Sequence, residues 1–220
     1  IEKNGLGATL AKAKKAGIPV ICYDRVLRYS NADLYISFDN EKVGELMATS
    51  LFKKIGRNKK IVKILGPDTD YNVEMVNRGF DRIADNYRAD VIGGVSCDGW
   101  KPEIAYDYVS ENMETVSKAD AIMCGNDSLA GEAIHALAER RLAGSIPVVG
   151  QDAELEACQR IVEGTQLMTV YKPVEKLAKT AAEYAVMLAK GEAIGQTDSF
   201  NDGKYDIPYV ALDPIEVNLY

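Results

Sequence analysis

Polar side chains follow four apolar runs of this chain, at the point where each run ends. The runs cover residues 18–23, 121–125, 146–150 and 167–171, and they lead into Asp24-Arg25, Asn126-Asp127, Gln151-Asp152 and Lys172. A carboxylate can accept hydrogen bonds from two neighbouring hydroxyls, Arg or Lys can donate to two, and an amide can do one of each. This mixture of side chains favours a small, polyhydroxylated ligand.

Trp100 is the only tryptophan and follows a predicted strand, in the loop Cys97-Asp98-Gly99-Trp100. The apolar face of a sugar stacks well on an aromatic wall, so Trp100 is the candidate platform. Other interpretations stay open for each position. Trp100 could belong to the core, Asp24-Arg25 could be a surface ion pair, and Lys172-Pro173 a plain strand exit. Asn126-Asp127 could cap the next helix, and for Asp127 alone we favour that interpretation.

The elements that must position these side chains alternate along the chain. Strands are predicted at residues 18–23, 34–38, 60–65, 90–96, 121–125, 147–150 and 167–171. Helices are predicted at residues 8–16, 40–55, 73–87, 102–116, 128–141, 155–163 and 174–190, before an extended tail at 207–217. Short apolar runs between helices indicate an α/β fold with buried parallel strands. Ligands of such sheets bind beyond the carboxyl ends of the strands, so the polar tips are expected to share a pocket.

Composition limits the function classes. The 220 residues are 47% hydrophobic, enough for a substantial core, and the net charge of −7 argues against a nucleic-acid partner. No apolar stretch reaches the roughly 18 to 20 residues of a membrane span. No Ser/His/Asp or Cys/His set, phosphate-binding loop or zinc spacing occurs, and the single His135 lies within a predicted helix. We therefore expect no enzyme, no cofactor and no metal.

The four cysteines form no C-x-x-C pair. Cys22 and Cys124 lie in apolar runs and are expected to be buried thiols, although the spacing leaves disulfides open.

Six stretches together carry a resemblance to a known family. They are residues 23–25, 35–46, 98–100, 125–127, 150–153 and 168–173, with the sequences YDR, YISFDNEKVGEL, DGW, GND, GQDA and MTVYKP. In this order they closely resemble the type I periplasmic sugar-binding proteins, in particular those that bind D-xylose. The resemblance extends over essentially the whole chain. It implies an α/β fold of two Rossmann-like lobes with parallel sheets, joined by three crossover strands and closing on one sugar.

The resemblance also implies the ligand residues. Asp24 and Arg25 would bind the pentose from the first lobe, and a second group would come from the second lobe and its hinge edge. That group is Asn72, Trp100, Asn126, Asp152 and Lys172. Glu74 stands where ribose-binding relatives have an arginine and is not assigned. The first lobe would comprise residues 1–38 and 173–211, and the second lobe residues 39–172 and 212–220.

The family pattern begins with strand–helix units that have no counterpart in this sequence. The first lobe is therefore expected to be incomplete, in a chain that starts at Ile1 and is a mature or truncated piece. If the fragment is real, weak sugar affinity would follow.

The resemblance implies a periplasmic or extracellular protein whose closed form presents D-xylose to a membrane ABC permease. A sensor that presents xylose to a membrane histidine kinase is the main alternative, and the effector domain of a LacI-type repressor is a weaker one. Four cysteines are many for an oxidising periplasm, which favours a Gram-positive or anaerobic source with a lipid anchor.

Overall fold

The computed structural model describes residues 6–219 and divides the chain into two compact units. Unit 1 contains the residues up to Asp39, then Thr69–Asn72 and Pro173–Asp213. Unit 2 contains Asn40–Asp68, Val73–Lys172 and Pro214–Tyr220. Each unit has its own sheet, and each is described separately.

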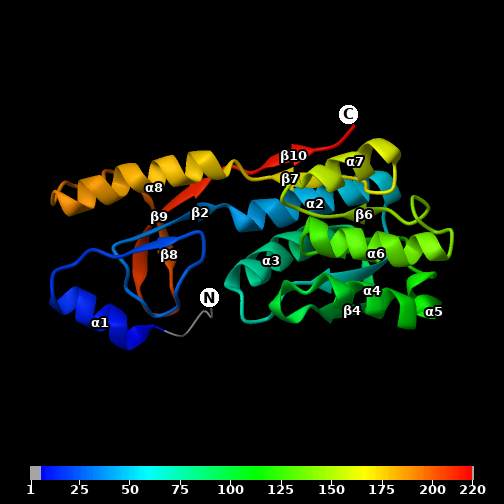
Figure 1. Ribbon diagram of the computed structural model, residues 1–220, viewed down its shortest axis with the longest axis horizontal. Helices are drawn as coiled ribbons and strands as arrows, with labels where there is room; N and C mark the ends of the chain where they lie inside the picture. Colours follow the sequence, from blue (N-terminus) through cyan, green and yellow to red (C-terminus); the bar gives the residue numbers. More distant parts are fainter. Residues whose placement is uncertain (1–5, 220) are drawn as a thin grey trace. The chain divides into compact units, whose positions relative to one another are not determined.

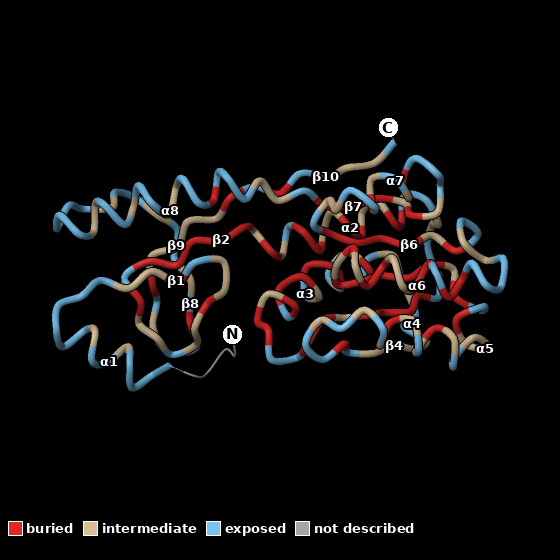
Figure 2. Tube along the Cα trace, in the orientation of Figure 1, coloured by how far each residue is buried: buried red, intermediate tan, exposed pale blue. Residues whose placement is uncertain are grey.

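Unit 1 is built on a four-stranded sheet in the order β1-β2-β9-β8. Figure 1 labels three of these strands, β2, β8 and β9. The strands are β1 (Ile21–Tyr23), β2 (Leu34–Phe38), β8 (Asp198–Asn201) and β9 (Asp206–Leu212), and the helices are α1 (Gly7–Lys15) and α8 (Val174–Ala189). β1, β2 and β9 run parallel, whereas β8 pairs antiparallel with β9. All five residues of β2 are buried, as the red colour of this strand in Figure 2 shows. Ile36 and Phe38 of β2 pack against Leu177 of α8.

Unit 2 contains a second four-stranded sheet, in the order β4-β3-β5-β6, with all neighbours parallel. Its strands are β3 (Lys60–Leu65), β4 (Asp90–Ser96), β5 (Ala121–Cys124) and β6 (Val148–Val149), with an antiparallel pair of β7 (Thr169–Tyr171) and β10 (Ile215–Val217). Its helices are α2 (Asn40–Ile55), α3 (Tyr71–Asn86), α4 (Pro102–Glu111), α5 (Met113–Val116), α6 (Asp127–Glu139) and α7 (Leu155–Glu163), with a short 3-10 turn η1 (Asp98–Trp100). The first two residues of α3 belong to unit 1.

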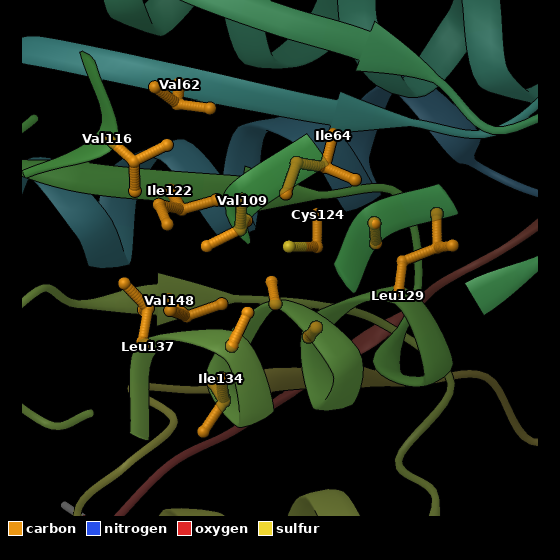
Figure 3. Packing of buried hydrophobic residues seen from close by; sticks show 14 of the residues in the cluster. Val62, Ile64, Val109, Val116, Ile122, Cys124, Leu129, Ile134, Leu137 and Val148 are labelled. Atoms are coloured by element: carbon orange, nitrogen blue, oxygen red, sulfur yellow. The ribbon is translucent and has the colours of Figure 1, made fainter. Parts of the chain in front are cut away.

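Helices cover both faces of the unit 2 sheet. Successive residues of a strand point to opposite sides of the sheet, and the strands of this sheet present apolar side chains on both sides. Ile122 faces the cluster formed with α4 and α6, which Figure 3 shows, whereas its neighbours Ala121 and Met123 face α2 and α3. Because buried apolar side chains pack on both sides of the sheet, β3 and β5 have apolar residues on both faces. Lys63 of β3 is the exception: it is 8% exposed, and its Nζ lies 5.4 Å from the centre of the Phe80 ring.

Most predicted elements are confirmed, with two corrections. The single helix expected over residues 102–116 is broken at Asn112, whose backbone leaves the helical region at φ −107° and ψ 27°. The Asn112 side chain donates to Tyr108 O, a local bond of the kind that ends helices. Strand β8 was not predicted, because its sequence DSFN is mostly polar and its pairing with β9 holds it in place.

Candidate functional site

Unit 2 brings four of the predicted ligand residues to one edge of its sheet. Trp100 follows β4, Asn126 follows β5, Asp152 follows β6, and Lys172 follows β7. β4, β5 and β6 belong to the parallel sheet, and Met168, just before β7, forms a parallel bridge with Val149 of β6. Since carboxyl ends of parallel strands meet at one edge, the four side chains lie at a common border of this unit.

The indole of Trp100 is seated on two glycines that follow β3 and β5. A Cβ on Gly66 would lie 2.4 Å from Trp100 Cη2, and one on Gly125 would lie 3.3 Å from Trp100 Cζ3. The ring also packs against the apolar cluster beneath the sheet, so the core interpretation holds for part of it. Its Nε1 atom is buried, however, and has no hydrogen-bond partner among the described residues. A buried, unpaired N–H is costly unless a ligand or water supplies an acceptor.

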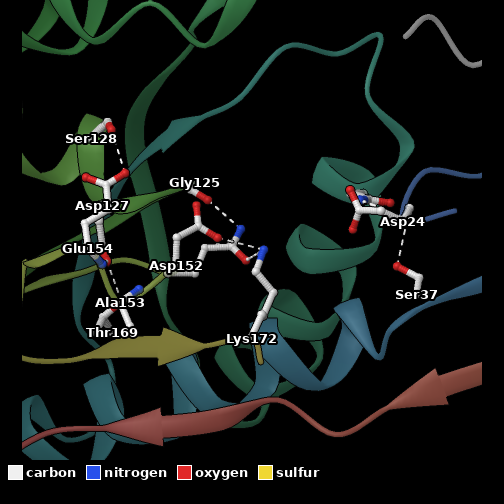
Figure 4. Close-up of polar contacts among 12 residues, drawn as sticks. Asp24, Ser37, Gly125, Asp127, Ser128, Asp152, Ala153, Glu154, Thr169 and Lys172 are labelled. Atoms are coloured by element: carbon white, nitrogen blue, oxygen red, sulfur yellow. Dashed lines mark hydrogen bonds and ion pairs between the residues drawn. The ribbon is translucent and has the colours of Figure 1, made fainter. Parts of the chain in front are cut away.

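Lys172 and Asp152 form an ion pair at the same edge. Lys172 Nζ lies 2.8 Å from Asp152 Oδ1 and donates to Gln151 Oε1 at 2.9 Å. The buried Gln151 in turn donates from Nε2 to Gly125 O, as Figure 4 shows with its dashed lines. An ammonium has three N–H donors, so Lys172 has one left for a ligand hydroxyl after these two bonds.

Asn126 caps helix α6, because its Oδ1 accepts a hydrogen bond from Leu129 N at 2.9 Å. The interpretation of Asp127 as a cap is wrong. Asp127 is the first residue of α6, is fully buried, and accepts hydrogen bonds from Thr169 Oγ1, Gln166 Nε2 and Glu154 N. Burial raises the pKa of the Asp127 carboxyl to about 6, although these three donors oppose the shift.

Unit 1 holds the other three predicted ligand residues. The backbone of Asp24 is fixed to β2: its N–H donates to Ile36 O, and its carbonyl accepts from Ser37 Oγ at 2.7 Å (Figure 4). Asn72 Nδ2 also donates to Asp24 O, at 3.4 Å, and Asn72 Oδ1 is buried with no partner in the part of the chain that the structure describes. The resemblance assigned Asn72 to the second lobe, whereas here it packs in unit 1.

Arg25 pairs with a residue that the sequence did not single out. Its Nη2 lies 2.9 Å from Oδ2 of Asp70, whose side chain is only 4% exposed. Asp70 Oδ1 accepts from Asn72 N at 3.0 Å, so one carboxylate orients both an arginine and an asparagine. Glu74, the unassigned position, is half exposed and lies 3.9 Å from Arg78.

Four residues that support the site were not among the site residues predicted from the sequence. They are Gly66, Asp70, Gln151 and Thr169. Gln151 stands at a polar strand end beside Asp152, so the sequence did point to its position, whereas the only signal for Thr169 is that it lies three residues before Lys172. The roles of Gly66 and Asp70 depend on contacts between segments distant in sequence.

The described residues contain no group of three or more His, Cys, Asp or Glu side chains placed to hold a metal ion. The four cysteines are free thiols; burial raises the pKa of Cys97 to about 11 and that of Cys124 well above its ordinary value, so both stay protonated. None of the described helices is long and apolar enough to cross a bilayer.

The chain has two units with parallel strands, and one sheet edge carries polar side chains and an indole. These features are typical of receptors for small ligands, and comparisons with known proteins identify the family. Residues 1–193 match the family described as "Periplasmic binding protein domain". The chain is 41% identical to the D-xylose-binding periplasmic protein of Haemophilus influenzae and 40% identical to that of Escherichia coli, in each case over 99% of this chain and 68% of the relative. The chain belongs to the periplasmic binding protein family.

Solved structures agree with this assignment. An ABC transporter solute-binding protein from Clostridium phytofermentans with bound β-D-glucose superposes with a TM-score of 0.85 at 26% identity. The match covers 99% of this chain and 74% of that one. The expected type I fold is thereby confirmed, the relatives are binding proteins as predicted and not enzymes, and family membership implies a periplasmic location.

Proposed function

We propose that this chain is an extracytoplasmic receptor for D-xylose or a closely related pentose, and that its closed form delivers the sugar to an ABC importer. The observation that carries the proposal is the arrangement of an indole, an amide, a carboxylate and an ammonium at one edge of unit 2, in a chain 41% identical to a D-xylose-binding protein. The protein acts outside the cytoplasmic membrane, either free or held there by a lipid anchor.

The chemistry of the proposed site suits a pentose. The Asp152 carboxylate accepts from two adjacent hydroxyls while Lys172, held 2.8 Å away, donates to one of them. Trp100 supplies the aromatic wall on which the C–H face of the sugar stacks. Asn126 completes this set in unit 2, and Asp24, Arg25 and Asn72 supply the equivalent mixture in unit 1.

Sugar binding is coupled to closure. A sugar that contacts residues of both units binds the closed arrangement more tightly than the open one, and it shifts the population toward closure by that difference in affinity. A membrane partner that recognises only the closed form then responds only to loaded receptor.

Tryptophan fluorescence tests sugar choice directly, since Trp100 is the single tryptophan. We expect a saturable change with D-xylose, weaker responses with D-ribose and D-glucose, and a smaller radius of gyration by X-ray scattering when xylose is bound. A response to D-glucose as strong as that to D-xylose would contradict pentose selectivity.

Deletion of the gene in its own host separates import from sensing. Import predicts loss of D-xylose uptake at low external concentration. Intact uptake together with loss of xylose-induced transcription would contradict the importer and favour a receptor that signals through a histidine kinase.

A further inference from the structure

The Asp152–Ala153 turn has a backbone that ordinary residues avoid. Asp152 has φ +107° and Ala153 has φ +53°, and neither is a glycine. A β-carbon makes this left-handed region unfavourable, and such residues persist where surrounding contacts over-determine them. Asp152 also carries the carboxylate that the proposed function places on the sugar, so whatever holds this turn also aims that carboxylate.

Three consecutive backbone N–H groups are held across the turn. Asp152 N donates to Val170 O at 2.8 Å, Ala153 N donates to Thr169 Oγ1 at 3.1 Å, and Glu154 N donates to Asp127 Oδ2 at 3.2 Å. Two of the three acceptors are therefore side chains, from the start of β7 and the start of α6 (Figure 4).

These two side chains are bonded to each other. Thr169 Oγ1 donates to Asp127 Oδ2 at 2.6 Å, and both residues are fully buried. The other oxygen of Asp127, Oδ1, accepts a hydrogen bond from Gln166 Nε2 at 2.8 Å. Asp127 directly follows Asn126, and Thr169 stands three residues before Lys172. One buried pair thus joins the segments that carry Asn126, Asp152 and Lys172.

Only a carboxylate at position 127 can accept every hydrogen bond of this network, because its partners are all donors. Glu154 N is a backbone N–H and can only donate. The Gln166 amide is fixed in orientation, because its Oε1 accepts from Arg160 Nε while its Nε2 donates to both Met168 O and Asp127 Oδ1. The hydroxyl of Thr169 accepts from Ala153 N and so directs its own proton to Asp127. An asparagine at 127 would turn an N–H₂ toward at least one donor.

We propose that Asp127 and Thr169 are positioning residues for sugar binding: their buried hydrogen bond holds the left-handed Asp152–Ala153 turn and thereby sets the direction of the Asp152 carboxylate. The inference rests on the proposed function for its consequence in affinity, but the structural effect on the turn can be measured without any sugar.

The test compares three variants and a control in the 220-residue chain. Asp127→Asn and Thr169→Val remove the carboxylate or the hydroxyl with little change of shape, whereas Thr169→Ser keeps the hydroxyl. Ile122→Val, in the core of the same unit, controls for lost stability away from the turn. Thermal unfolding and D-xylose affinity by calorimetry are measured for each, with a ligand-free crystal structure of Thr169→Val.

We expect about tenfold or greater loss of xylose affinity in Asp127→Asn and Thr169→Val, because each leaves a buried donor unpaired. Thr169→Ser should stay within about threefold of the unmodified chain, and Ile122→Val should bind normally despite its lower melting temperature. If Asp127→Asn does not fold, the two Thr169 variants decide the matter. In the crystal, residues 152 and 153 of Thr169→Val should leave their left-handed conformations.

Two results would overturn the inference: an unaltered turn in the Thr169→Val crystal, or a Thr169→Ser variant that loses as much affinity as Thr169→Val. If the unmodified chain binds no sugar, the proposed function fails, and the crystal structure alone still decides whether the pair holds the turn.

Discussion

The indole of Trp100 occupies the space where a side chain at Gly66 would begin. A Cβ at Gly66 would lie 2.4 Å from Trp100 Cη2 and 2.6 Å from two further ring carbons. Because the ring is wedged between the ends of β3 and β5, it cannot yield without leaving its place at the sheet edge.

Gly66→Ala should therefore displace the indole and weaken xylose binding by about tenfold, an effect typical of overpacking by one methyl group. The emission of the only tryptophan should shift to longer wavelength, because the buried ring would become solvated. Trp100→Phe assigns the emission to this residue. Unchanged emission together with unchanged affinity in Gly66→Ala would contradict the proposed role of the Gly66–Trp100 contact.

Lys172→Met should lower xylose affinity by roughly 5- to 100-fold, because it removes a ligand donor and leaves the Asp152 carboxylate without its cation. Calorimetry measures the change. The matched control is Lys118→Met, which breaks an exposed ion pair with Glu114 in the same unit and should leave affinity unchanged. Equal effects of the two substitutions would show that Lys172 acts only through net charge.

Helices α2 and α3 approach closely enough that each needs a glycine. A Cβ on Gly44 would lie 1.9 Å from Val76 O, and one on Gly79 would lie 2.0 Å from Glu41 O. Since both obstacles are backbone, Gly44→Ala should cost about 2 kcal/mol or more in the free energy of unfolding, measured in urea. Gly7→Ala in the exposed helix α1, where no atom lies within 4 Å of the new Cβ, should be neutral or slightly stabilising.

The buried Asp127 carboxyl should make stability depend on pH. Its pKa is raised to about 6 in the folded chain, from an ordinary value of 3.8, mainly by burial and in part by the nearby Asp152. The folded state then binds the proton more tightly than the unfolded state. The stabilisation from this group is complete below pH 3.8 and is lost as pH rises through 6.

Comparison with Asp127→Asn isolates this effect, because the other titrating groups are common to both proteins. Between pH 7.5 and pH 4, the free energy of unfolding of the unmodified chain should rise by about 2–3 kcal/mol relative to that of the variant. Urea unfolding at several pH values measures the difference. A difference that does not vary with pH would show that Asp127 titrates at its ordinary pKa.

The order of strands and helices could be predicted from the sequence because most strands are continuous apolar runs bounded by turns. The elements β3, β4 and α7 begin and end at the residues that the sequence pattern predicted. The polar strand β8 could not be predicted, since only its pairing with β9 makes it extended.

The sheet-edge residues of the candidate site were also accessible from the sequence, because parallel strands place their ends together. Their supports were not. The sequence Asn-Asp before a predicted helix made Asp127 a candidate helix cap. Only the fold shows that Thr169 Oγ1 and Glu154 N donate hydrogen bonds to its carboxylate. Gly66 and Asp70 owe their roles to neighbours that no local pattern reveals.

The most direct test is calorimetric titration of D-xylose into this chain and into Asp152→Ala. We predict saturable, one-to-one binding by the unmodified chain and none by Asp152→Ala. Asp90→Ala, an exposed carboxylate at the opposite end of a strand in the same sheet, should bind like the unmodified chain. The absence of any heat from a demonstrably folded chain, or undiminished binding by Asp152→Ala, would contradict the assignment of this sheet edge as a sugar site.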